Sequence, residues 1–142
     1  MKSNRRYTPE RIEELKENEC FVFGSNKRGE HIGGAARIAR DKFGAIDGVA
    51  EGSTDLRTYA IPTLDENFKP VPVYELAISI AYFLSRVRKF PQVTFYLTKI
   101  GCGIAGWDIG EVRRIFWSAI EKTCGNFSLD NLIYPKEFEE NE

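Results

Sequence analysis

An alternating order of strand and helix signals is the feature that most constrains the fold of this chain. Short apolar runs rich in β-branched and aromatic residues, typical of buried strands, occupy residues 20–24, 56–63 and 93–100, and a shorter run follows at 131–135. Amphipathic helical patterns separate these runs. Because parallel strands are joined by crossover helices, the order predicts a three-layer α/β/α fold with a mostly parallel central sheet.

Several of the expected helices carry start or stop signals. Gly44 ends a helix after residues 35–43, and Asp108 with Glu111 three residues later resembles a capping box. The motif TPE at residues 8–10 predicts a further short helix, which runs to about Glu17. The apolar stripe of the helix before Gly44 consists of Ala35, Ile38, Ala39 and Phe43.

The chain has 142 residues, of which 42% are hydrophobic and 29% are charged. This length and balance favour one soluble globular domain over residues 1–142. We expect an N-terminal helical segment at 1–18 and an acidic, flexible tail at 136–142.

A formal net charge of −1 makes nucleic acid an unlikely partner. Membrane-length apolar runs and the apolar core of a signal peptide are absent, so we expect a cytoplasmic protein. The oligomeric state stays open. A basic group could form a patch, but no aromatic platform accompanies it. That group consists of Lys27, Arg28, Arg37, Arg40 and Lys42.

The cysteines predict neither disulfides nor a metal site. Cys20, Cys102 and Cys124 are widely spaced, and His31 is the only histidine. We therefore expect reduced thiols, no bound metal and no cofactor.

Two glycine-rich loops each lead into a helix and suggest an anion site. They read GSNKRGEHIGG at residues 24–34 and GCGIAG at 101–106, and both should lie at the carboxyl edge of the sheet. Unpaired N–H groups at helix N-termini attract anions, so the pair could hold a diphosphate. The alternative is that the glycines only shape turns. Neither loop is a GxGxxG motif or a P-loop.

Four side chains in these loops each have two interpretations. Asn26 could bind a ribose hydroxyl or position water, or it could form an Asx turn. His31 could be a general base or phosphate contact, or a solvated loop residue. Cys102 could be a nucleophile, although a small wall residue is favoured. Trp107 could stack on a ligand or belong to the core.

The order of these motifs resembles the macrodomain family of ADP-ribose-binding modules. The matching segments are FVFGSN, HIGGAARIARDKFG, TYAIPT and TFYLTKIGCGIAGW, within residues 20–134. A compact, phage- and bacteria-associated macro-like group resembles the chain more closely. By resemblance, Asn26 contacts the distal ribose, Gly33 and Gly34 line one side of a diphosphate, and residues 101–106 wrap the other.

The resemblance implies one set of binding residues and two tentative catalytic ones. The catalytic residues are Asn26 and His31. The ligand-binding set is Ser25, Asn26, Gly33, Gly34, Ala35, Gly101, Cys102, Gly103, Ile104, Ala105, Gly106 and Trp107.

The sequence also departs from the family pattern. Hydrolytic members often carry an acid where this chain has Ala35 and Ala36, and Ala105 replaces an aromatic residue. The family's adenine-contacting Asp has no counterpart here, although Tyr134 or Phe138 could stack on the base.

Three functional hypotheses follow. The first is binding of ADP-ribose or a related nucleotide diphosphate, with hydrolysis of an ADP-ribosyl linkage or phosphate ester as its enzymatic form. The second is a non-catalytic reader of ADP-ribosylated protein, or a module that sequesters a nucleotide signal. The third is an interaction module that has lost its ligand.

Overall fold

The computed structural model describes residues 6–103, 105–123, 125 and 129–139, and it contains four parallel strands and three α-helices in that part of the chain. The sheet order is β2-β1-β3-β4. The strands are β1 (Glu19–Asn26), β2 (Thr58–Leu64), β3 (Thr94–Leu97) and β4 (Leu132–Ile133). The helices are α1 (Gly34–Phe43), α2 (Val73–Lys89), α3 (Ile109–Thr123) and the short 3-10 helix η1 (Lys136–Phe138). This arrangement confirms the predicted fold class.

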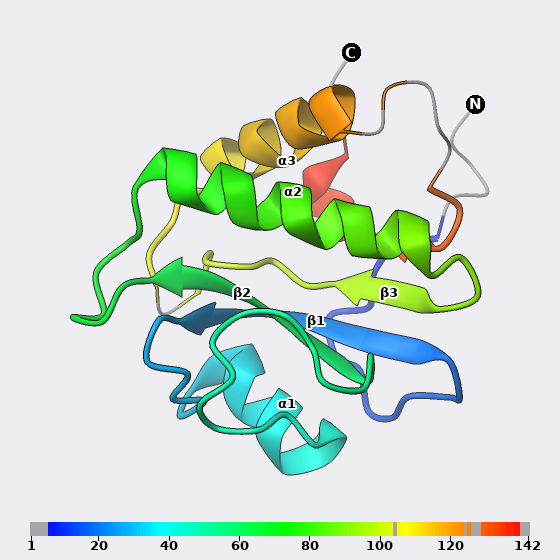
Figure 1. Ribbon diagram of the computed structural model, residues 1–142, viewed down its shortest axis with the longest axis horizontal. Coiled ribbons are helices and arrows are strands. Elements are labelled where there is room, and N and C mark those ends of the chain that lie inside the picture. The colour runs from blue at the N-terminus through cyan, green and yellow to red at the C-terminus, as the bar shows by residue number, and fades with distance from the viewer. Residues whose placement is uncertain (1–5, 104, 124, 126–128, 140–142) are drawn as a thin grey trace.

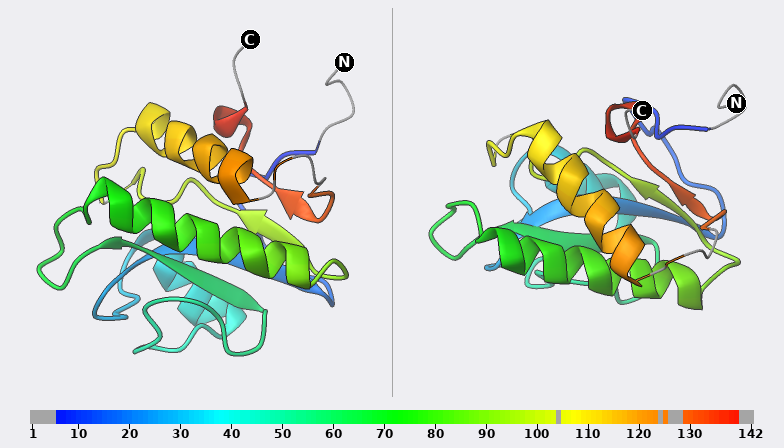
Figure 2. Two further views of the ribbon diagram at one scale, coloured as in Figure 1. Left: turned by 45° about the horizontal axis from the view of Figure 1, so that its top comes forward. Right: turned by 90° about the horizontal axis from the view of Figure 1, so that it is seen from above.

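Helices cover both faces of the sheet (Figure 1). Helix α1 packs on one face, and α2 and α3 pack on the other (Figure 2). A hydrophobic core lies on each face of the sheet, and successive β1 residues point into opposite cores. Phe21 and Phe23 pack on the α1 side, whereas Cys20 and Val22 pack on the side of α2 and α3. Burial on both faces explains why β1 reads as a continuous apolar run. In the described part of the chain, the longest apolar helix falls short of what crossing a membrane requires.

The predicted helix signals at Gly44 and Asp108 are confirmed. Gly44 follows α1 in the left-handed conformation, with φ of 84°. The Asp108 carboxylate accepts a hydrogen bond from the Glu111 backbone N–H at 3.1 Å, which caps α3. Strand β1 continues to Asn26, so Ser25 and Asn26 belong to the strand end and not to the loop after it.

The predicted helix at residues 8–17 is wrong, because this segment has no helical structure. Thr8 does not cap a helix: its backbone N–H donates to Tyr134 O at 2.9 Å, and its hydroxyl donates to Leu97 O at 2.7 Å. Leu15 is buried against the α1-side core. Hydrogen bonds to strand ends and this burial outweigh the weak tendency of so short a sequence to form a helix.

The start of the predicted flexible tail is ordered. Residues Lys136–Phe138 form η1, and Phe138 is fully buried. Its carbonyl accepts a hydrogen bond from Trp117 Nε1 at 2.6 Å. The Phe138 ring packs against Phe116 of α3, with centroids 5.5 Å apart. Residues 140–142 lie outside the described part of the chain.

Candidate ligand-binding site

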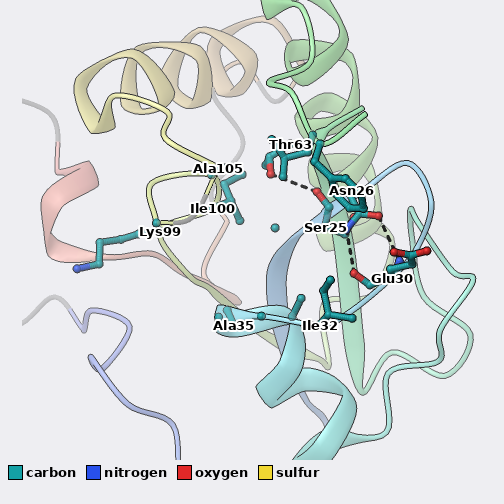
Figure 3. Close-up of a pocket in the computed structure, with 17 residues that line it drawn as sticks. Ser25, Asn26, Glu30, Ile32, Ala35, Thr63, Lys99, Ile100 and Ala105 are labelled. Atoms are coloured by element: carbon teal, nitrogen blue, oxygen red, sulfur yellow. Dashed lines mark hydrogen bonds between the residues drawn. The ribbon is translucent and has the colours of Figure 1, made fainter. Parts of the chain in front are cut away.

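A cavity of about 490 Å³ lies at the carboxyl edge of the sheet, between the two glycine-rich loops (Figure 3). The ends of β1 and β2, the N-terminus of α1 and the loop after β3 form its walls. The residues that line it are Gly24, Ser25, Asn26, Glu30, Ile32, Gly33, Gly34, Ala35, Ala36, Thr63, Leu64, Phe68, Lys99, Ile100, Gly101, Gly103 and Ala105. Eight of the twelve predicted ligand-binding residues therefore meet here.

Asn26 lines this cavity, but its side chain also organises the loop that follows it. Its Oδ1 accepts hydrogen bonds from the backbone N–H groups of Arg28 at 3.1 Å and Glu30 at 3.2 Å. Its Nδ2 donates to Glu30 O at 2.9 Å. This is the turn-forming role that the sequence left as an alternative. One hydrogen on Nδ2 is left over for a ligand or water, since an amide has two.

Ser25 is buried at the base of the cavity. Its hydroxyl donates to Ala50 O, and its carbonyl accepts from Thr63 Oγ1 at 3.2 Å. The Ser25 carbonyl therefore joins β1 to β2, and its hydroxyl joins β1 to the segment that precedes β2. These bonds fix the end of β1, where Asn26 lies.

The N-terminus of α1 opens into the cavity. Gly33 is the N-cap residue, and no side chain caps the helix. Its first turn contains no acidic residue. Residues Gly33 to Ala36 line the cavity, and the first N–H groups of a helix have no intrahelical acceptors. Gly34 has φ of 58°, which glycine adopts without strain. The cavity thus contains donors and the positive end of a helix dipole.

The second loop is held close to β1 and β2 by small residues and one tryptophan. A Cβ atom on Gly24 would come within 3.1 Å of Gly101 N, and one on Gly101 within 2.8 Å of Trp107 Cδ1. Gly101 also has φ of 75°. Trp107 is 9% exposed, and its Nε1 donates to Thr63 O at 3.0 Å. The tryptophan is therefore mainly a structural support for the loop.

A second cavity of about 710 Å³ adjoins the first, and Gly34, Ala35, Lys99 and Gly103 line both. Its other walls come from residues 9–13, α1, and the region around Asp108. Cys102 and Trp107 line this cavity and not the first. Ile38, expected in the core, is 42% exposed and lines it too.

Lys99 stands where the two cavities meet. Its ammonium group lies 3.3 Å from Glu10 and 3.6 Å from Glu137. The hydrogen bond to Glu10 is the largest cause that raises the pKa of Lys99, so the group stays positively charged. Figure 3 shows its side chain pointing away from Asn26.

The structure places His31 outside the cavity lining. The residue is fully buried, and its ring packs edge-on against Phe23 with centroids 5.1 Å apart. Nε2 lies 3.1 Å from Ile46 O, and the backbone N–H donates to the Asp47 carboxylate at 3.1 Å. These contacts tie the loop after β1 to the loop after α1, which is neither of the roles considered from the sequence.

The other predicted contacts divide between the core and the loop. Tyr134 and Phe138 are 4% and 0% exposed and pack against Phe116, so neither lines the two cavities. Gly106 N donates to Gly103 O at 3.0 Å, which closes the loop without bringing Gly106 into the cavity lining. Ile104 lies outside the described residues.

Sequence reasoning missed several lining residues. Thr63 and Ile100 end predicted strands at this edge, so their position carried a usable signal. No sequence signal pointed to Phe68, because it reaches the cavity from the loop between β2 and α2. Glu30 is the one acidic side chain in the first cavity's lining. Among the described residues, no group of His, Cys, Asp and Glu side chains is arranged to hold a metal ion.

Cys102 is not activated as a nucleophile. Burial raises the pKa of its thiol to about 11; nearby Lys99 opposes this shift and Asp108 adds to it. Only roughly 0.1% of the thiol is then ionised at pH 8.

We expect slow alkylation of Cys102 by iodoacetamide at pH 8, with a rate that rises about tenfold per pH unit toward pH 11 because the thiolate is the reacting species. Peptide mass spectrometry of the folded protein measures this rate at Cys102 alone, and the buried Cys20 serves as the unreactive control. Rapid alkylation at pH 7 would show that the thiol is activated.

Similarity to solved structures identifies the fold. The macrodomain of Mycobacterium tuberculosis DarG superimposes with a TM-score of 0.64 at 14% identity, covering 91% of this chain and 96% of that one. The chain has a macrodomain-like fold. A protein of unknown function from Bacteroides thetaiotaomicron is also similar, with a TM-score of 0.58, 11% identity, and coverage of 87% and 90%. No family model and no curated protein matches the sequence.

Proposed function

We propose that this macrodomain-like protein binds ADP-ribose or a related nucleotide diphosphate at the carboxyl edge of its sheet. The observation that carries the proposal is the uncapped N-terminus of α1, which opens into a cavity opposite the glycine loop at 101–103. Helix N-termini bind phosphates through free N–H groups and the helix dipole. The resemblance of the motifs to ADP-ribose-binding modules supports the same ligand class.

The two adjoining cavities suit a ligand with a diphosphate in its middle. The diphosphate would lie at the shared wall formed by Gly34, Ala35 and Gly103, where the two loops approach each other. A ribose would occupy the first cavity beside Asn26, and the nucleoside would occupy the second beside Ile38. Both volumes lie in the range typical of small-molecule sites.

Thermal shift measurements test this proposal. ADP-ribose should raise the melting temperature because it binds only the native state. AMP and ribose 5-phosphate should each give smaller shifts, since each fills one cavity. If millimolar ADP-ribose, AMP and NAD all leave the melting temperature unchanged, the proposal is contradicted.

Hydrolysis of an ADP-ribosyl linkage is the second candidate function, and Glu30 favours it. Figure 3 shows its side chain beside Asn26, on the wall where the ribose would lie. The Glu30 carboxylate lies 3.3 Å from Arg28, which leaves one oxygen available to accept a proton from an attacking water. This acid stands at a different position from the acid of hydrolytic macrodomains, which Ala35 and Ala36 replace in this chain.

We expect Glu30→Gln to lower turnover of an ADP-ribosylated substrate by about 100-fold or more, because the amide cannot accept the proton. Binding of ADP-ribose should change little, since the residue keeps its size and its backbone contacts with Asn26. Chromatography of the products measures turnover. If the unaltered protein binds the substrate but forms no product, the protein is a non-catalytic reader and Glu30 has no catalytic role.

A further inference from the structure

Helix α2 carries an exposed apolar stripe on the side opposite the core. Tyr74, Ile78 and Tyr82 are 65%, 50% and 62% exposed. Their spacing of four residues places them in one line along the helix. The buried side of α2 is equally apolar, and Leu76, Ile80, Phe83 and Val87 pack into the core. A surface helix normally presents polar residues to solvent. In α2 the exposed side is also apolar, and packing within this fold does not require it to be.

The stripe lies at the surface of the molecule and away from the proposed ligand site. Figure 2 shows α2 on the outside of the sheet with α3 beside it, and no described element lies over its outer side. None of the three stripe residues lines either of the two cavities at the sheet edge. The ligand site therefore does not account for these exposed side chains.

We propose that a second copy of this chain covers the stripe, with the two α2 helices packed antiparallel about a two-fold axis at Ile78. The stripe is symmetric about this residue, because Tyr74 and Tyr82 lie four positions to either side. Antiparallel pairing therefore places Ile78 against Ile78 and each Tyr74 against the Tyr82 of the other copy. A patch that matches itself in this way is what a two-fold interface requires. Tyrosine is also enriched at interfaces.

The charges at the two ends of α2 favour the same arrangement. Arg86 and Lys89 are exposed at its C-terminal end. Asp65 and Glu66 lie in the loop that reaches past its N-terminal end, as Figure 1 shows. With the helices antiparallel, the C-terminal end of each α2 lies beside the loop at 65–72 before the N-terminus of the other. That loop also carries Lys69, so its two acids leave it with a formal charge of −1. The basic end of each helix then meets a loop of opposite net charge on its partner, whereas a parallel arrangement would bring like charges together.

Sedimentation velocity of the full chain from micromolar to millimolar concentration tests this proposal. We expect a dimer whose population rises with concentration. Ile78→Arg should weaken it by about 30-fold or more, because two charges would be buried together on the axis. The matched control is Ile46→Arg, since Ile46 is also half-exposed, at 54%, but lies in the loop after α1. That variant should dimerise like the unaltered protein.

Charge reversal tests the antiparallel geometry. The double substitution Arg86→Glu and Lys89→Glu should weaken the dimer, and adding Glu66→Lys should restore it, since each helix end would again face the opposite charge. Circular dichroism checks that every variant folds. A monomer at all concentrations, equal dissociation of the two arginine variants, or a failure of Glu66→Lys to restore dimerisation would each overturn the proposal.

Discussion

Replacing Gly33 by aspartate should strongly weaken ligand binding while leaving the protein as stable as before, or more so. Gly33 has extended backbone angles, φ −154° and ψ 160°, which any residue adopts. An aspartate here would cap α1, and N-cap carboxylates stabilise helices by up to about 1 kcal/mol. The same carboxylate would occupy the place proposed for the diphosphate. Repulsion between the two should lower the affinity for ADP-ribose by about 100-fold.

The matched control is Gly33→Asn, which has the same shape and also caps the helix but carries no charge. Isothermal titration calorimetry measures the affinity, and thermal unfolding measures the stability. Affinity should fall much less in the asparagine variant than in the aspartate variant. Equal affinities in the two variants would mean that no ligand anion lies at the N-terminus of α1.

Truncation of Trp107 should have the second large effect, on stability and binding together. Its ring packs against Gly101, and its Nε1 bonds Thr63 O. Trp107→Ala should cost about 3–5 kcal/mol of unfolding free energy, as is usual for a buried aromatic residue. Because the loop at 101–106 loses its support, the affinity for ADP-ribose should also fall by about tenfold or more. Denaturant unfolding and calorimetry measure the two quantities.

Trp117→Ala provides the control for this variant. Trp117 packs against Phe116 and Tyr134, with ring centroids 5.2 and 5.5 Å away, and lines neither cavity. It should lose stability without loss of affinity. Should Trp107→Ala fail to fold, Trp107→Phe keeps most of the ring contacts and removes only the Nε1 donor. An unchanged affinity in a folded Trp107 variant would show that the loop holds its shape without this residue.

The fold was predictable because its signals are local. The apolar run of β1 and the stop at Gly44 each follow from a few neighbouring residues. The cap at Asp108 does so as well. The order of these elements then limits the topology to a parallel sheet with helices on both faces.

The errors came from contacts between residues far apart in the sequence. Thr8 looked like a helix cap because the strand ends at Leu97 and Ile133, which its hydroxyl contacts, lie about 90 and 125 positions away. His31 looked like a solvated loop residue because its burial and its contact with the carbonyl of Ile46 depend on how two loops pack. Neither contact leaves a trace in the local pattern.

The site itself was only partly predictable. The glycine loops gave its two sides, since loops after parallel strands meet at one edge of a sheet. Phe68 comes from the loop after β2, and Glu30 becomes a lining residue only through the turn that Asn26 builds. Their positions depend on tertiary structure.

An amide-resolved NMR titration with ADP-ribose tests the central claim most directly. The proposed diphosphate site predicts the largest shifts at the backbone N–H groups of residues 33–36 and 101–103, with smaller shifts around Asn26 and Ile38. Shifts confined to other parts of the molecule, or none at millimolar ADP-ribose, would contradict it.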